Sequence, residues 1–159
     1  MKKFFLLVPI VLLIAVAVTA FGFMKNGVVS ASGAELHFVE HTTAIKQITV
    51  GTATDLRGNY IVFDDPVFDA ADKHQVGNVN GTCVNTSNTM EECRFTIILQ
   101  KGQITLEGPE IDTTSGSYVD DTFSVTGGTG IYNGAEGQLV QKTLKTAAGL
   151  EFKFSLQIH

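Results

Sequence analysis

Apolar and polar residues alternate through most of this 159-residue chain, and this alternation limits the folds that the chain can adopt. Residues 150–158 show it most clearly, because four apolar side chains there alternate with polar ones. Alternation with a period of two is typical of a strand with one buried face. Beyond the N-terminal segment, no stretch keeps a helical period over three turns. We therefore expect an all-β fold.

Eight segments with strand character follow one another at short spacing and are joined by turns rich in Gly, Asp and Asn. They are residues 36–50, 58–63, 75–84, 93–100, 103–107, 122–125, 138–144 and 150–158. Many short strands indicate a sandwich or a barrel. We expect an eight-stranded antiparallel barrel, because closure removes the sheet edges and leaves an interior that can hold one small ligand.

Two local features of this strand pattern carry their own predictions. The alternation slips near Thr43 and Ala44, which suggests a bulge within one long first strand. Asp64 and Asp65 directly precede Pro66, so we expect them in a turn after the second strand.

A glycine-rich run, DTFSVTGGTGIYNGAEGQL at residues 121–139, lies between two strand patterns. Its glycine spacing is similar to that of a dinucleotide-binding loop, but that motif needs a helix after the loop. The residues that follow Gly134 are interrupted by glycine and have strand character instead. We interpret the run as a tight corner between two strands, with bulges.

The N-terminal segment indicates the compartment. Lys2 and Lys3 precede an apolar run over residues 4–24, and small residues suited to signal-peptidase cleavage follow. This pattern is typical of an export signal, and the run is also long enough for an uncleaved membrane anchor. We expect residues 1–34 to be a signal peptide or N-terminal membrane anchor. Residues 35–159 would then form one secreted or extracytoplasmic domain, with no other membrane contact.

Charge and cysteine content narrow the partners of this domain. Of the 11 Lys and Arg residues three precede residue 35, so eight remain against 16 Asp and Glu. This acidic balance argues against nucleic acid as a partner. Cys83 and Cys93 lie on consecutive predicted strands of an exported chain, which favours a disulfide. Two cysteines without nearby histidines make a poor zinc site, and we expect no metal.

Several segments resemble one known family. Residues 102–109 (GQITLEGP) and the glycine-rich run are similar to the C-terminal half of allene oxide cyclases and to the related dirigent proteins. Residues 56–63 (LRGNYIVF), 67–69 (VFD) and 76–83 (VGNVNGTC) are similar to the second and third strands of that family. The resemblance implies an eight-stranded barrel with an apolar cavity, commonly trimeric, that needs no cofactor.

The catalytic positions of that family are altered here. The first-strand glutamate and asparagine of the cyclases align with His37 and Val39, and a family tyrosine is replaced by Glu110. A pocket cysteine of the family matches Cys83. Where dirigent proteins keep an arginine, this chain has Glu136. The resemblance therefore implies the fold more directly than it implies an activity.

The candidate catalytic residues are Glu40, His37 and Cys83. A carboxyl among apolar neighbours, as at Glu40, would have a raised pKa and could act as a general acid or base. The alternative for Glu40 and His37 is an ordinary strand or surface role, because the sequence does not say which strand face lines the lumen. The candidate substrate-binding residues are Tyr60, Phe63, Phe95, Tyr132 and Glu110.

These observations leave three functions open. The first is a cofactor-independent isomerase, cyclase or dirigent-type stereo-guiding protein that acts on a small apolar or phenolic molecule. The second is a non-catalytic, lipocalin-like carrier of such a molecule, which the altered catalytic positions favour. The third is an extracellular structural or adhesion domain. The expected partners are the small ligand and, by resemblance, two further copies in a homotrimer, with no cofactor.

Overall fold

The computed structural model describes residues 33–111, 120–146 and 149–159, which form nine strands and one short 3₁₀ helix, η1 (Gly130–Tyr132). The strands are β1 (Ala34–His41), β2 (Ile45–Ile48), β3 (Tyr60–Asp69), β4 (Gln75–Asn85), β5 (Met90–Leu99), β6 (Gly102–Ile111), β7 (Asp121–Gly128), β8 (Gly137–Thr146) and β9 (Gly149–Ile158). The predicted all-β class is confirmed. Within these ranges no helix is long and apolar enough to cross a membrane. The predicted leader lies outside the described residues and stays a prediction.

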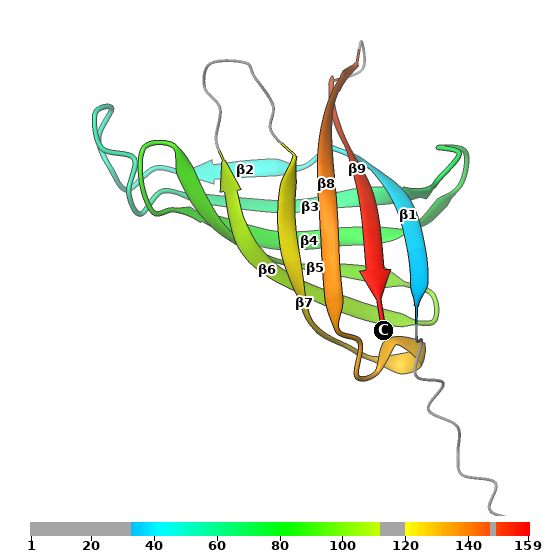
Figure 1. The fold of residues 1–159 in the computed structure, drawn as a ribbon. Coiled ribbons are helices and arrows are strands. Elements are labelled where there is room, and N and C mark those ends of the chain that lie inside the picture. Colours follow the sequence, from blue (N-terminus) through cyan, green and yellow to red (C-terminus); the bar gives the residue numbers. More distant parts are fainter. Residues whose placement is uncertain (1–32, 112–119, 147–148) are drawn as a thin grey trace, which may run out of the picture.

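Eight of the nine strands close into an antiparallel barrel (Figure 1). From β3 to β9 each strand pairs with the next one along the chain, and β1 then pairs with both β9 and β3. The β1–β3 register places Val39 opposite Phe68 and Glu40 opposite Val67. Strand β2 pairs with β3 outside this ring and adds a ninth strand. The predicted eight-stranded barrel is therefore confirmed, with one extra strand.

Two of the predicted boundaries were wrong, and Asp65 is involved in both. Residues 36–50 do not form one bulged strand, because the chain leaves β1 after His41 and starts β2 at Ile45. The backbone N–H groups of Thr43 and Ala44 donate to the Asp65 carboxylate instead of to a neighbouring strand. Asp65 itself lies inside β3 and not in a turn, since pairing with β4 continues through Pro66. Tertiary pairing has overridden the local turn preference.

Inward-facing side chains fill one half of the barrel. They come from seven strands and are buried: Val67, Val79, Ile97, Ile104, Leu106, Phe123, Val125, Leu139, Leu156 and Ile158. Helix η1 lies across this end, near the C-terminus (Figure 1), and Ala135 just after it is buried in the same cluster. Burying one Leu or Phe side chain stabilises a fold by roughly 1.5–3 kcal/mol. This apolar plug is the main core of the domain.

The glycine-rich corner between β7 and β8 is tight, as the sequence predicted. Gly130 has φ 63°, and a Cβ at this position would clash with the carbonyl oxygen of Lys101. The pairing of β6 with β7 shifts register between Thr105 and Leu106, which is the expected bulge. Glycine is needed here because the backbone of the corner lies directly against the β5–β6 turn.

We predict that Gly130→Ala lowers the free energy of unfolding by about 2 kcal/mol or more, because it combines a clash with a strained backbone conformation. Gly134→Ala is the matched control. Gly134 also has a positive φ, 79°, but nothing lies within 4 Å of a Cβ there, so only the cost of the backbone conformation remains. Urea unfolding of both variants measures the difference. Equal losses would contradict the role given to the close backbone approach.

Candidate functional site

The other half of the barrel is hollow and holds a cavity of about 350 Å³. This volume lies in the usual range for small-molecule sites. Phe95 lines the cavity and Phe123 belongs to the plug, and their rings pack edge to face with centroids 4.8 Å apart. The cavity therefore begins where the plug ends. Its apolar wall comes from β2, β3, β5, β6, β9 and the β2–β3 loop: Ile45, Leu56, Ile61, Phe63, Phe95, Ile111, Phe152 and Phe154.

Polar side chains line the same cavity from eight of the strands. They are Glu40, Gln47, Asp65, Asn85, Glu91, Glu110, Asp121, Gln141 and Thr143. Alternate residues of a barrel strand face the lumen, so the polar residues from the ring strands reach the cavity from inward positions, whereas Gln47 comes from β2 outside the ring. Along β5, for example, Glu91, Cys93 and Phe95 all point inward. The hollow half is therefore apolar on part of its wall and acidic on the rest.

Glu40 has the most perturbed carboxyl in this cavity. It is only 5% exposed, and it lies beside Asp65 and Glu110. Burial first, and then the nearby carboxylates of Asp65 and Glu110, raise the pKa of Glu40 from 4.5 to about 8. A carboxyl with this pKa is mostly protonated at neutral pH and can donate a proton.

Asp65 lies beside Glu40 and is hydrogen-bonded through one of its two oxygens. One oxygen of Asp65, Oδ1, accepts hydrogen bonds from the backbone of Thr43 and Ala44 and from the Thr43 hydroxyl. The other oxygen, Oδ2, is buried and has no hydrogen-bond partner among the described residues. Glu40 and Asp65 therefore form a pair of neighbouring carboxyl groups, and their hydrogen bonding adds to the burial and the nearby charges that raise the pKa of Glu40.

Neutral donors contact the other three carboxyl groups of the cavity. Asn85 Nδ2 donates to Glu91 over 2.9 Å, and Gln141 Nε2 donates to Glu110 over 3.1 Å. The Ile111 N–H donates to Asp121 over 3.2 Å. Burial raises the pKa of Asp121, and the hydrogen bond from Ile111 partly opposes that rise. These amides fix the orientation of the carboxyl groups that they contact.

The predicted disulfide joins Cys83 of β4 to Cys93 of β5, which lie directly opposite each other. Both sulfurs line the cavity, and Cys93 Sγ lies 3.3 Å from a carboxylate oxygen of Glu110. Disulfide sulfurs carry no proton, so this approach is a contact and not a hydrogen bond. Cys83 therefore offers no thiol to a substrate while the bond is intact.

Two groups of side chains bring potential metal-binding atoms close together. In the cavity these are Cys83, Cys93, Glu91 and Glu110, but sulfurs joined in a disulfide are poor ligands. The other group, His41, Asp72 and Glu151, has partly or fully exposed members, and His41 Nε2 lies 2.7 Å from Asp72. Neither group has the arrangement of a closed structural zinc site.

The structure separates the sequence-predicted site residues into two sets. Glu40, Phe63, Phe95, Glu110 and the disulfide all line the cavity. His37, Tyr60 and Tyr132 are the residues that do not line it.

Each of these three lies elsewhere for a clear reason. His37 has the opposite strand parity to Glu40, and its half-exposed ring hydrogen bonds to Ser155 over 3.2 Å. Tyr60 is 43% exposed, since its neighbour Ile61 takes the inward position on β3. Tyr132 belongs to η1 and packs on the apolar plug at the far end.

Seven polar cavity residues were not among the predicted site residues: Gln47, Asp65, Asn85, Glu91, Asp121, Gln141 and Thr143. A signal for some of them was present in the sequence. Asp65 is two residues from Phe63, and Glu91 is four from Phe95, so each shares the parity of a predicted binding residue. Once Phe63 and Phe95 are taken to face the lumen, the alternation of their strands places Asp65 and Glu91 on the same inward face.

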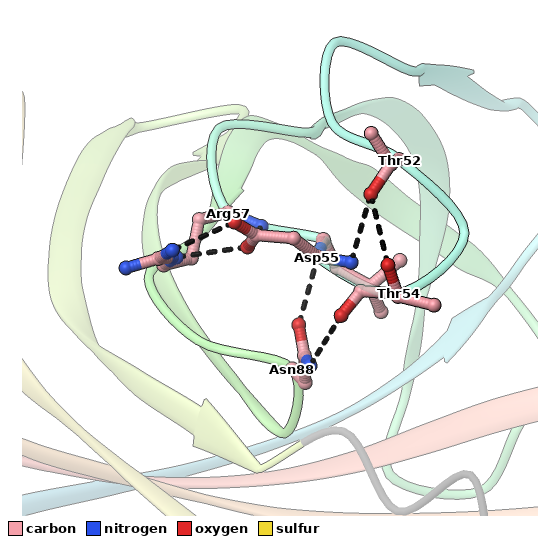
Figure 2. Close-up of polar contacts among 6 residues, drawn as sticks. Thr52, Thr54, Asp55, Arg57 and Asn88 are labelled. Carbon is pink, nitrogen blue, oxygen red and sulfur yellow. Dashed lines mark hydrogen bonds and ion pairs between the residues drawn. The ribbon is translucent and has the colours of Figure 1, made fainter.

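A polar network holds the loop between β2 and β3 at the edge of the cavity (Figure 2). The Leu56 N–H donates to Asn88 Oδ1 over 2.9 Å, and Asn88 Nδ2 donates to the Thr54 carbonyl over 3.1 Å. Asp55 and Arg57 form an ion pair on the same loop. Asn88 belongs to the β4–β5 turn, so it ties two loops together and fixes Leu56, a cavity residue, in place.

The fold and the cavity define a closed antiparallel barrel of the ligand-binding kind. The model of the allene oxide cyclase barrel like domain matches residues 39–155, so the chain belongs to this family. The resemblance seen in the sequence is thereby confirmed. No curated protein matches the chain significantly.

Three solved structures are similar to this one. Pyocyanin demethylase is 25% identical, with a TM-score of 0.64, and the match covers 77% of this chain and 99% of that one. A pterocarpan synthase dirigent protein is 16% identical, with a TM-score of 0.65 and coverage of 81% and 96%. The Diels–Alderase AbmU from Streptomyces koyangensis is 18% identical, with a TM-score of 0.62 and coverage of 80% and 63%. The last two likenesses show the fold alone.

We predict that Glu40 makes stability fall as pH rises. The folded protein keeps a proton on Glu40 up to a pKa of about 8, whereas the unfolded chain loses it near 4.5. The contribution of Glu40 is therefore fully present below about pH 4.5 and is lost by about pH 8. Glu40→Gln should be more stable than the parent protein at about pH 8.5, by on the order of 3 kcal/mol, with no difference near pH 4.

Urea unfolding at several pH values measures this difference. Glu92→Gln is the control, because Glu92 is exposed on the outer face of β5 and should give a pH-independent offset. The free energies of unfolding of the parent protein and of Glu40→Gln are compared as a function of pH. If the two curves stay parallel from about pH 4 to about pH 9, Glu40 is not a buried carboxyl that keeps its proton.

We predict that Asn88→Ala loosens the loop over the cavity edge. The variant loses both hydrogen bonds to residues 54–56, each worth about 1 kcal/mol. Amide hydrogen exchange at Leu56 should become at least about fivefold faster, with little change in the central strands. Asn88→Asp keeps the acceptor for Leu56 and should protect that amide better. Unchanged exchange at Leu56 in Asn88→Ala would show that the loop is held by other contacts.

Proposed function

We propose that this protein binds one small molecule in the hollow half of the barrel and rearranges it by proton transfer, without a cofactor. The observation that carries this proposal is the protonated Glu40 carboxyl buried in the wall of a 350 Å³ cavity. A buried carboxyl with a pKa near 8 lowers the stability of the fold. Groups with such strongly shifted pKa values are common at functional sites. The reaction class is isomerisation or cyclisation, in which no atoms are gained or lost.

The proton steps of this reaction balance within the cavity. Glu40 donates its proton to an oxygen or carbon atom of the substrate where negative charge develops. Glu110, whose carboxylate acts electrostatically on Glu40, is placed to accept a proton that leaves another substrate atom. Transfer of that proton back to Glu40 restores the starting state. The apolar wall excludes water and holds a flexible substrate in a reactive shape.

The similar structures support a small-molecule role. Pyocyanin demethylase, matched over 99% of its length, is named for an activity on a small molecule. The dirigent protein and the Diels–Alderase are named for pterocarpan synthesis and for a cycloaddition. Barrels of this fold are thus used for several chemistries, and the particular chemistry comes from the lining residues.

A non-catalytic carrier is the second candidate. It is favoured by the positions of the other two predicted catalytic residues, because Cys83 is in a disulfide and His37 points out of the barrel. In this case Glu40 would donate a hydrogen bond to the bound molecule and would transfer no proton.

We also propose that the barrel acts outside the cytoplasm. Two lysines followed by an apolar run at residues 4–24 support export. A disulfide within the barrel fits an oxidising compartment. Assembly as a homotrimer stays a prediction from the family resemblance. Fractionation of the native cells, followed by mass measurement of the mature chain, tests both the location and the cleavage.

The parent protein and Glu40→Gln, purified from the same native source without denaturation, distinguish the two functions. We expect both to release a small molecule on extraction, measured by liquid chromatography and mass spectrometry. A catalyst predicts isomers, with equal mass but different retention, in the two extracts. A carrier predicts the same molecule from both proteins. Empty protein from both preparations would overturn the proposed function.

A further inference from the structure

Two buried side-chain polar atoms have no hydrogen-bond partner among the described residues: the Thr42 hydroxyl oxygen and Asp65 Oδ2. Asp65 lines the cavity, whereas Thr42 does not. Glu40 lies beside Asp65, yet Oδ2 still lacks a partner. Native proteins satisfy nearly all of their buried polar atoms, because an unpaired one costs the full free energy of its removal from water. The cavity wall therefore carries one polar atom whose partner the described residues do not supply.

The other oxygen of Asp65 fixes the orientation of this carboxyl group. Oδ1 accepts hydrogen bonds from the backbone N–H groups of Thr43 and Ala44 and from the Thr43 hydroxyl. The Ala44 nitrogen lies 2.7 Å from Oδ1, and the hydroxyl oxygen lies 3.0 Å from it. Residues 43 and 44 form part of the connection between β1 and β2, so the donors are held by the fold. Oδ2 is the oxygen that is left to accept a hydrogen bond.

An aromatic surface lies in the same cavity. Phe63 is two residues before Asp65 on β3 and lines the cavity with it. The ring centroids of Phe63 and Phe154 lie 6.2 and 6.3 Å from that of Phe95, so the three rings form one surface. Aromatic rings bind flat apolar molecules by stacking and by edge-to-face contact. A flat molecule with an O–H or N–H group at one end would match both the rings and Oδ2.

We propose that Asp65 is the polar anchor of the ligand, and that its Oδ2 atom accepts a hydrogen bond from an O–H or N–H group of a flat, largely apolar molecule. The body of the molecule lies against Phe63, Phe95 and Phe154. An uncharged donor is sufficient, since a carboxyl oxygen without a proton accepts from hydroxyl and N–H groups alike. The inference deepens the proposed function and rests on it in one respect, namely that a small molecule occupies the cavity. It places the donor end of that molecule beside Glu40, the acid of the proposed reaction.

Three bicyclic probes of nearly the same shape test the inference on the full-length protein. Indole offers an N–H donor, indene offers neither a donor nor an acceptor, and benzofuran offers an oxygen acceptor without a donor. Binding is measured by calorimetry at about pH 6, where Glu40 keeps its proton. Indole should bind at least about tenfold more tightly than either of the other two, because a site built to accept a donor rejects analogues that lack one.

Asp65→Asn distinguishes an anchor from a residue that only packs. The backbone N–H groups of Thr43 and Ala44 keep the side-chain oxygen of the variant in the place of Oδ1, so Nδ2 takes the place of Oδ2. An acceptor thereby becomes a donor. Indole should lose its advantage over indene, and benzofuran should gain at least about threefold relative to indole.

Asp64→Asn is the matched control. It makes the same chemical change at the next residue, whose side chain is exposed on the opposite face of β3. The order of the three affinities should be the same in this variant as in the parent protein.

Nuclear magnetic resonance of the parent protein gives a second measurement, which holds even if Asp65→Asn does not fold. The amide protons of Thr43 and Ala44 donate to the carboxyl group that is proposed to bind the ligand. A donor bound at Oδ2 withdraws charge from that group. At equal saturation, the two amide chemical shifts should therefore move more with indole than with indene.

The outcomes that contradict the inference differ from those that contradict the proposed function. Equal affinities of the three probes, or a preference for benzofuran, would overturn the Asp65 anchor. Retention of the indole preference in Asp65→Asn would also overturn it, because another group would then hold the donor. In each case a small molecule recovered on native extraction leaves the proposed function in place. Failure of all three probes to bind overturns the anchor as well, and with empty protein on extraction the proposed function fails with it.

Discussion

Closure of the ring by β1 against β3 is the interaction on which the rest of this structure depends. The antiparallel register sets Glu40 opposite Val67, so Asp65, two residues earlier on the inward face of β3, becomes a diagonal neighbour of Glu40. The same closure leaves no free edge within the ring and directs every second side chain into the lumen. The carboxyl pair is therefore a direct result of how the barrel closes.

The two halves of the lumen have opposite energetic roles. The plug of Leu, Ile, Val and Phe side chains supplies the burial that stabilises the domain. The hollow half contains buried carboxyl groups, which lower stability because they are removed from water and lie close to one another. Glu40 reduces that cost by keeping a proton. The candidate site is thus located where the packing is incomplete.

The parts of the site that could be predicted are those that depend on strand periodicity. Phe63, Phe95 and the paired cysteines followed from alternation and spacing, and Glu40 was a candidate because apolar residues surround it in sequence. Asp65 was misjudged, since the local sequence Asp-Asp-Pro favours a turn while pairing with β4 keeps it in a strand. Its role is set by contacts with Thr43 and Ala44, more than twenty residues away in the chain.

Local patterns in the chain were enough to predict the all-β class, the antiparallel barrel, the disulfide and the glycine corner, because each depends on residues near one another in the chain or on side-chain alternation. The face of each strand that points inward became known from the closed barrel alone, and with it the fact that Glu40 lines the cavity while His37 does not. Alternation is symmetric under a shift of one residue, so it defines two faces without naming the inner one. Ring closure removes that symmetry, and it gathers carboxyl groups from five strands into one cavity.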